Sequence, residues 1–249
     1  MKTMSRNCCE ISYFLKLIAI YFPLLFFNKA LIFWYTILMK IYKTINHIAG
    51  ENTYYLVNDQ AVILIDPGSN GQEIIAKIKS FEKPLVAILL THTHYDHIFS
   101  LDLVRDAFDH PPVYVSEKEA AWLSSPDDNL SGLGRHDDII TVIARPAENF
   151  LKLKQPYQLN GFEFTVLPTP GHSWGGVSFV FHSDELVVTG DALFRETIGR
   201  TDLPTSNFED LITGIRQELF TLPNHYRVYP GHGPSTTICH EKNANPFFH

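Results

Sequence analysis

Residues 85–97 read LVAILLTHTHYDH, an uninterrupted apolar run followed at once by three histidines and one aspartate within six positions. The apolar run is typical of a buried central strand. In the extended loop that follows, His92 and His94 point the same way, because side-chain direction repeats every two residues. Asp96 and His97 lie at the turn into the next helix, so their side chains can face a point next to the one that His92 and His94 face. Imidazole and carboxylate suit zinc, iron or manganese, so the stretch predicts a metal site at a strand end.

Strand and helix patterns alternate on both sides of this stretch, which predicts one α/β domain of about 210 residues. Between the predicted elements, residues 124–156 are rich in Pro, Asp, Asn and Gly and are interpreted as a long functional loop. The expected strands are 54–58, 61–66, 85–90, 113–116, 162–167, 177–181, 186–189 and 227–229, and the expected helices follow the turn 67–71 and span 98–108, 117–123 and 208–219.

Three later positions repeat the pattern of a β-run that ends in a small-residue turn with one metal-ligand type. His172 follows Gly171, Asp191 follows Gly190, and His232 follows Gly231. With the first cluster they supply five histidines and two aspartates. That set suffices for two metals with a shared carboxylate and an open water position. A structural zinc site would be closed by four ligands, often cysteines, so the pattern favours a catalytic centre.

Four motifs carry a family resemblance. THTHYDH (91–97), TPGHSWGGVSF (169–179), VVTGDALF (187–194) and YPGHGPSTTI (229–238) resemble the metal motifs of the metallo-β-lactamase superfamily. LFRETIGRTDLP (193–204) and the closing NPFF (245–248) resemble its small glyoxalase II-like, or hydroxyacylglutathione hydrolase-like, branch. The resemblance runs from about Ile41 to the end of the chain. It implies a four-layer αββα sandwich of the α/β (α+β) class, with the site at one edge of two sheets.

Residue by residue, the resemblance also implies a ligand set. The first metal would be held by His92, His94 and His172, the second by Asp96, His97 and His232, and Asp191 would bridge them. The implied metals are two divalent ions, with zinc preferred over iron or manganese. Such a pair lowers the pKa of a shared water molecule, which can then attack a carbonyl group. By analogy, Asp96 is a candidate for relaying a proton to a leaving thiolate. The implied activity is hydrolysis of a small thioester.

Two arginines are candidates for substrate binding. Arg195 and Arg200 follow the bridging aspartate, and a guanidinium pairs with a carboxylate of the type that a glutathione-like thioester carries. The alternative for each is a surface arginine. Further candidates to line the pocket are Tyr95, His136, Trp174 and Phe194.

Other activities stay open at this point. A persulfide dioxygenase of the same superfamily shares a GRTD-like turn, here residues 199–202, and would use one iron bound by His92, His172 and Asp191. A lactonase is a further alternative, and a non-catalytic metal-binding module would need the 124–156 loop to close the coordination. Longer glyoxalase II enzymes carry a C-terminal helical domain that grips glutathione, whereas 17 residues follow His232 here. The complete second ligand set favours hydrolysis.

Composition limits the partners. Lys and Arg number 20 and Asp and Glu 27, which gives a net charge of −7 and no basic surplus for holding a phosphate backbone. We therefore expect no nucleic-acid partner, and the resemblance implies a small-molecule thioester as the partner. Cys239 is the only cysteine beyond residue 38, so no disulfide framework is expected and a cytoplasmic location is favoured. The sequence sets no oligomeric state.

Residues 1–38 form a hydrophobic N-terminal extension of a different character from the predicted hydrolase domain, residues 39–249. Lys16, Pro23 and Lys29 cut it into apolar runs of about ten, whereas a spanning helix needs about 20. No small-x-small cleavage site follows it, which disfavours a signal peptide. The extension is either an over-extended start before Met39, a membrane-associated anchor, or a packed helix. We assign no functional residue to it.

Overall fold

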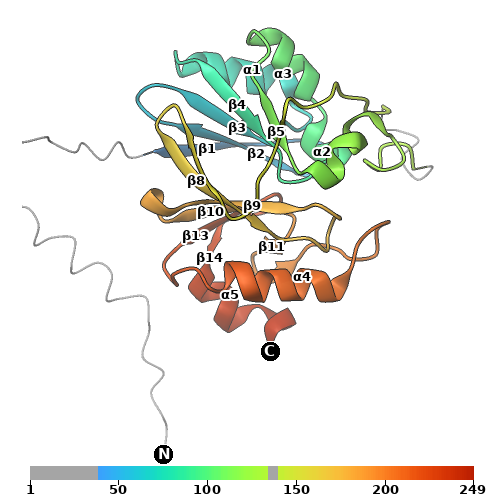
Figure 1. The fold of residues 1–249 in the computed structure, drawn as a ribbon, viewed down its shortest axis with the longest axis vertical. Helices are drawn as coiled ribbons and strands as arrows, with labels where there is room; N and C mark the ends of the chain where they lie inside the picture. Colours follow the sequence, from blue (N-terminus) through green and yellow to red (C-terminus); the bar gives the residue numbers. More distant parts are fainter. Residues whose placement is uncertain (1–38, 134–139) are drawn as a thin grey trace, which may run out of the picture. The chain divides into compact units, whose positions relative to one another are not determined.

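The computed structural model describes residues 39–133 and 140–249, and these form four layers. Two six-stranded sheets pack face to face, α1 and α3 cover the outer face of one, and α4 and α5 cover the outer face of the other (Figure 1). The predicted αββα sandwich is therefore confirmed. The predicted extension, residues 1–38, lies outside the described residues, so its boundary stays a prediction.

The first sheet combines an antiparallel meander with a parallel half. Strands β1 to β3 are antiparallel neighbours, and β3 to β6 run parallel. The Asn58 side chain closes the predicted hairpin by accepting the backbone N–H groups of Gln60 and Ala61, each at 2.8 Å. In sheet order the strands are β1 (Lys40–Ile45), β2 (Asn52–Val57), β3 (Val62–Ile65), β4 (Leu85–Leu89), β5 (Val113–Val115) and β6 (Asn149–Phe150).

Three helices and one 3₁₀ segment belong to this half. Helix α1 (Gly71–Ser80) connects β3 to β4 and buries its predicted isoleucine face. The single helix expected over 98–108 is instead α2 (Tyr95–Ile98) and α3 (Leu101–Ala107), because the Ser100 N–H donates to the Pro67 carbonyl at 3.0 Å. The helix expected over 117–123 is the 3₁₀ segment η2 (Glu117–Ser124).

The second sheet places β10 (Leu186–Gly190) at its centre, parallel to β13 (Arg227–Pro230) and antiparallel to β9 (Val177–Phe181). Helix α4 (Phe208–Gly214) continues as a π-helical turn, Ile215–Leu219. The remaining elements are β7 (Pro156–Leu159), β8 (Phe162–Pro168), β14 (Thr236–Thr237), the separate hairpin of β11 (Leu193–Phe194) and β12 (Thr197–Ile198), α5 (Ile238–Ala244), and the 3₁₀ turns His182–Asp184 and Pro246–Phe248.

Apolar side chains fill all three interfaces between the layers. Strands buried on both faces have no polar alternation, which explains the continuous apolar runs of β4 and β10. The sequence patterns missed the short and edge strands β1, β6, β7, β11, β12 and β14 together with α5. Strand β1, for example, is mostly exposed and carries no apolar alternation.

The two sheets are tied together next to the predicted site. The backbone N–H of Asn52 in β2 donates to the Gly231 carbonyl at 2.7 Å, and its side chain donates to the Pro230 carbonyl at 3.0 Å. The Tyr54 hydroxyl donates to the same Pro230 carbonyl at 2.7 Å. These bonds fix the end of β13 against the first sheet.

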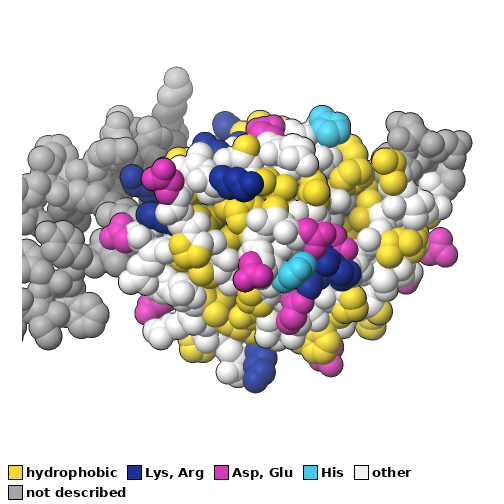
Figure 2. All heavy atoms as spheres, turned by 90° about the horizontal axis from the view of Figure 1, so that it is seen from above, with side chains coloured by type: hydrophobic (Ala, Val, Ile, Leu, Met, Phe, Trp, Pro, Cys, Tyr) yellow, Lys and Arg dark blue, Asp and Glu magenta, His cyan; other side chains and the backbone are white. Residues whose placement is uncertain are grey.

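Charges of both signs mix on one face of the protein (Figure 2), and no helix of the described residues is suited to cross a membrane. On the face above α1 and α3, Lys and Arg side chains are interspersed with Asp and Glu and with apolar groups (Figure 2). Within residues 39–133 and 140–249, no helix has the length and apolar character needed to cross a bilayer.

Gly171 tests how closely the fold is packed around the site. Its φ is +121°, and a Cβ there would overlap the backbone nitrogen of Leu211. We expect Gly171→Ala to lower the free energy of unfolding by at least about 2 kcal/mol. Gly214→Ala is the matched control, since its Cβ would meet Thr169 at an ordinary 3.5 Å. Urea denaturation should find this second variant at least as stable as the parent, because alanine favours the helical conformation that Gly214 adopts. Equal losses in both variants would contradict the argument.

Candidate metal centre

All seven predicted ligands meet at the carboxyl ends of the central strands. His92 and His94 follow β4, and α2 carries Asp96 and His97. The remaining three come from the second half of the chain, with Asp191 directly after β10, His232 directly after β13, and His172 in the loop between β8 and β9. The parallel pairing of β10 with β13 places the strand ends that precede Asp191 and His232 side by side.

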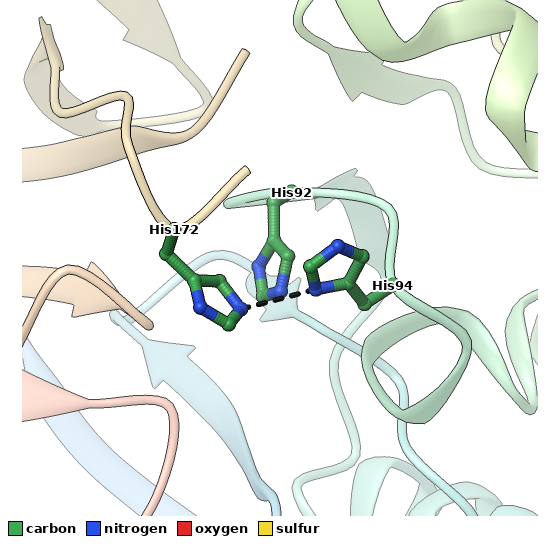
Figure 3. Close-up of side chains that lie close together, drawn as sticks. All are labelled: His92, His94 and His172. Carbon is green, nitrogen blue, oxygen red and sulfur yellow. Dashed lines mark hydrogen bonds between the residues drawn. The ribbon is translucent and has the colours of Figure 1, made fainter. Parts of the chain in front are cut away.

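His92, His94 and His172 form the first cluster, in which one ring nitrogen of each lies within 4.8 Å of the others. Figure 3 shows the three rings converging from two separate loops. His94 Nδ1 and His172 Nε2 are 3.0 Å apart, and all three residues are buried. Three imidazoles at this spacing can offer nitrogen ligands to one ion.

Asp96, His97 and His232 form the second cluster at a similar spacing. His232 Nε2 lies 3.3 Å from an Asp96 oxygen. Asp191 stands between the clusters, since its carboxylate lies 3.4 Å from His97 Nε2, 3.4 Å from His172 Nε2 and 3.3 Å from His232 Nε2. This position is what a bridging ligand requires.

The two clusters differ in their electrostatics. Burial and the neighbouring His172 lower the pKa of His94 to about 3. Burial also lowers the pKa of His92 well below its usual value. At His232, burial acts in the same direction, but Asp191 and Asp96 outweigh it and raise the pKa to about 10. His92 and His94 are therefore neutral imidazoles that can offer a lone pair to a metal, whereas the second cluster balances histidine against carboxylate.

Buried atoms without hydrogen-bond partners show that these residues fit metal ions. Nε2 of His92 and of His97 and Oδ1 of Asp191 are buried and have no hydrogen-bond partner among the described residues. A buried polar atom left without a partner costs about 1–3 kcal/mol. Two divalent ions would satisfy these atoms.

The outward-facing ring nitrogens of the histidines are held by hydrogen bonds. His97 Nδ1 lies 3.0 Å from Asp66 Oδ2, His172 Nδ1 lies 3.0 Å from the Arg200 carbonyl, and His232 Nδ1 lies 3.1 Å from the Ala49 carbonyl. An Nδ1–H that donates to each oxygen fixes the tautomer and turns Nε2 toward the cluster.

Asp66 and Glu51 are two buried carboxyl groups that the sequence interpretation missed. Besides His97, Asp66 accepts the backbone N–H of Thr91 at 2.8 Å and the Thr91 hydroxyl at 2.6 Å. It directly follows β3, so its strand-end position was a usable signal. Glu51 Oε1 lies 3.9 Å from His97 Nδ1, and burial raises the pKa of this carboxyl well above its usual value. These three side chains also lie at ligand spacing, although Asp66 is already engaged by hydrogen bonds.

Glu119 in η2 ties together the two loops that carry the first cluster. Its Oε2 accepts the backbone N–H of Thr93 at 2.8 Å, and its Oε1 accepts that of Gly175 at 2.6 Å. The carboxylate is fully buried. It binds Thr93, the residue before His94, and Gly175, the third residue after His172. No sequence pattern marked this glutamate, because its partners are backbone groups distant in the chain.

Beside the clusters lies a cavity of about 400 Å³. Arg200 lines it, and its guanidinium makes two 2.7 Å bonds to Asp202. Arg195 does not line it but sits exposed in the turn of the β11–β12 hairpin, so its predicted substrate contact gains no support from the geometry. The full lining is Ala49, His94, Tyr95, Asp96, Leu130, His172, Asp191, Phe194, Thr197, Ile198, Arg200, Leu203 and His232.

The other pocket candidates divide in the same way. Tyr95 and Phe194 line this cavity as expected. Trp174 lines a separate pocket and stacks on Trp122 with ring centroids 6.5 Å apart. His136 lies outside the described residues, so its predicted role stays a prediction.

Residues 49–232 match the family model described as the metallo-beta-lactamase superfamily. The chain belongs to this superfamily. The predicted resemblance to it is thus confirmed, and the chain is a metallo-hydrolase of this family. Its His and Asp clusters agree with the metal ions that the superfamily binds.

Two curated relatives narrow the neighbourhood. A probable metallo-hydrolase of Streptococcus pyogenes serotype M6 is 99% identical over 224 residues, covering 90% of this chain and 97% of the relative. The hydroxyacylglutathione hydrolase GloC of Haemophilus influenzae is 33% identical over 192 residues, covering 76% of this chain and 88% of the relative.

Two solved structures share the fold. The B3 metallo-beta-lactamase BLEG-1 superposes with a TM-score of 0.79 at 37% identity, covering 84% of this chain and 99% of that one. The protein TTHA1623, solved in a di-iron-bound form, superposes with a TM-score of 0.72 at 33% identity, covering 83% of this chain and 99% of that one. One of these similar folds is described as a lactamase, and the other is described with two iron ions.

Elemental analysis of purified protein should approach two metals per chain, because one ion could not use all seven ligands. Asp191→Ala should reduce the metal content at both positions, since Asp191 contacts members of both clusters. His232→Ala should leave close to one ion per chain. A metal content that never exceeds one after reconstitution would contradict the binuclear arrangement.

Glu119→Gln should loosen the first cluster, because an amide NH₂ would face a backbone N–H in place of a carboxylate oxygen. We expect metal affinity to fall by about 10–100-fold and the metal-free protein to lose about 1–3 kcal/mol of stability. Glu117→Gln is the control, since Glu117 is exposed on the same segment. Metal titration and urea denaturation measure the two effects. Parent-like affinity in Glu119→Gln would show that the cross-loop bonds do not position the ligands.

Proposed function

We propose that the protein is a binuclear metal-dependent hydrolase of small thioesters, in the same reaction class as the hydroxyacylglutathione hydrolases. The observation that carries the proposal is the position of Asp191 between two complete ligand clusters that open into one cavity. The GloC relative supports the thioester class, since its own name states that activity.

The first cluster, the second cluster and Asp191 would hold the two ions. Divalent ions at such sites lower the pKa of a water molecule and polarise a carbonyl group. We propose zinc as the metal, with iron or manganese as alternatives that metal analysis must separate. The chain's own contribution is to orient the imidazoles through Asp66, Arg200 and Ala49.

Asp96 is the proposed proton carrier. It lies on the cavity wall, and its carboxylate contacts His232 at 3.3 Å. Burial would raise the pKa of this carboxyl, but His97 and His232 outweigh burial and lower it. The ionised group can take a proton as the water oxygen bonds to the acyl carbon. It can then return that proton to sulfur as the carbon–sulfur bond breaks.

A persulfide dioxygenase is the second candidate. His92, His172 and Asp191 do lie together, as a single iron bound by two histidines and one carboxylate would need. The complete second cluster weighs against it, because a mononuclear reaction leaves Asp96, His97 and His232 without a role. Lactone or β-lactam hydrolysis would use the same two ions and differs only in the ring substrate.

The remaining proposals concern the protein's partners and its location in the cell. We propose a small-molecule thioester as the partner, no nucleic acid, and a cytoplasmic location, with membrane association tied to residues 1–38 alone. Interspersed charges on the face above α1 and α3 support the absence of a nucleic-acid surface there.

S-lactoylglutathione should be hydrolysed to a carboxylic acid and a free thiol at the same rate with and without oxygen, because no redox step is needed. The experiment supplies this thioester, a persulfide, a lactone and a β-lactam to zinc-loaded and iron-loaded protein. Thiol release, ring opening and oxygen uptake are recorded together. Oxygen uptake with the persulfide, combined with no thiol release from any thioester, would overturn the hydrolase proposal.

Arginine variants refine the same assay. If the Arg200 guanidinium leaves Asp202 to bind a substrate carboxylate, Arg200→Ala should raise KM with unchanged metal content. The expected loss in kcat/KM corresponds to about 1.5–3 kcal/mol, as for a hydrogen bond to a charged group. Arg195→Ala is the matched control, since Arg195 is exposed outside the cavity. Equal effects of both variants would remove Arg200 from substrate binding.

A further inference from the structure

Part of the wall of the catalytic cavity is apolar and buried. Leu130, Ile198 and Leu203 line it with exposed fractions of 3%, 8% and 9%. Phe194 is half-buried beside them, with its ring 6.0 Å from that of His232. The hydrocarbon surface therefore begins directly at the second ligand cluster.

Leu130 reaches this wall through a strained backbone. Its φ is +71°, in the left-handed region that a bulky side chain rarely adopts. The neighbouring Asn129 holds it there. The Asn129 carbonyl accepts the Tyr95 N–H at 2.9 Å, and its buried side chain donates to the carbonyls of Trp122 at 3.2 Å and Val142 at 2.9 Å. Strain that surrounding bonds maintain at a cavity wall points to a role in binding.

The rim of the cavity has the opposite character. Ala49, Thr197 and Arg200 are exposed. Of the described residues that line the cavity, Arg200 is the single Lys or Arg, and Asp202 balances its charge. Polar parts of a substrate are thus accommodated at the rim, and apolar parts at the buried wall.

We propose that Leu130, Ile198, Leu203 and Phe194 form an acyl-binding subsite that selects thioesters of small aliphatic acids over those of 2-hydroxy acids. The inference rests on the proposed thioesterase function and names its substrate class. The large, polar thiol part of a biological thioester fits the open rim near Arg200. The acyl group then lies against the buried wall, where a hydroxyl group would lose water without gaining a partner from the hydrocarbon side chains.

Isobutyryl and lactoyl thioesters of glutathione test this selectivity, because they differ only by a methyl group in place of a hydroxyl group. After correction for the uncatalysed rate of each, kcat/KM should be about 10–100-fold higher for the isobutyryl thioester, as for an apolar pocket that meets a hydroxylated isostere. An equal or higher value for the lactoyl thioester would overturn the subsite.

Leu130→Asn gives an independent test. Asparagine is similar in size and tolerates the left-handed region, so the loop should keep its conformation. The isobutyryl-to-lactoyl ratio should fall by about tenfold or more with unchanged metal content, and an unchanged ratio would overturn the proposal. Leu153→Asn is the matched control, since Leu153 is an exposed leucine that does not line this cavity. Its ratio should equal that of the parent.

The two proposals can fail separately. If neither thioester is hydrolysed with any metal, the thioesterase proposal fails, and calorimetry of the intact thioesters with metal-loaded protein then tests the cavity by itself. Tighter binding of the isobutyryl thioester, weakened in Leu130→Asn, supports an apolar subsite. Equal affinities, or tighter binding of the lactoyl thioester, overturn it.

Discussion

The Asp191 carboxylate lies within 3.4 Å of histidine nitrogens from three separate parts of the chain, and the site depends on this arrangement. A buried carboxylate in this position is stable only if it is paired, because isolated buried charge is strongly unfavourable. His97, His172 and His232 provide that pairing, and each is fixed on its far side by an oxygen acceptor. The strand ends that carry these residues must therefore be placed accurately relative to one another.

Close backbone packing makes the convergence possible. A Cβ on Gly231 would overlap the Asp191 carboxylate, and one on Gly190, whose φ is +50°, would overlap Thr91. Bonds from Asn52 and Tyr54 to the end of β13 and from Glu119 to two ligand loops then hold the halves of the sandwich together. The apolar layers supply stability, while these few polar contacts set the geometry of the centre.

The ligand centre and the cavity place different demands on the chain. The centre fits two divalent ions and agrees with membership in the metallo-β-lactamase superfamily, whose relatives hydrolyse different substrates according to their names. Loop residues form part of the cavity wall, with Leu130 held in a strained conformation and Arg200 neutralised by Asp202. The proposed acyl selectivity therefore depends on these loops rather than on the ions.

The sequence by itself was enough to identify the superfamily through its motifs and, from that resemblance, to predict the αββα fold. The seven candidate ligands stood out because four of them cluster directly after one apolar strand and the other three each follow a β-run and a small-residue turn. The sequence also revealed the long loop that supplies Leu130, although not which residue enters the cavity. Only the tertiary structure revealed Glu119, the Arg200 carbonyl behind His172 and the exposed position of Arg195. Contacts of this kind join a side chain to backbone groups far away in the chain, or turn a residue outward at a hairpin, and neither leaves a periodic or spacing signal in the sequence.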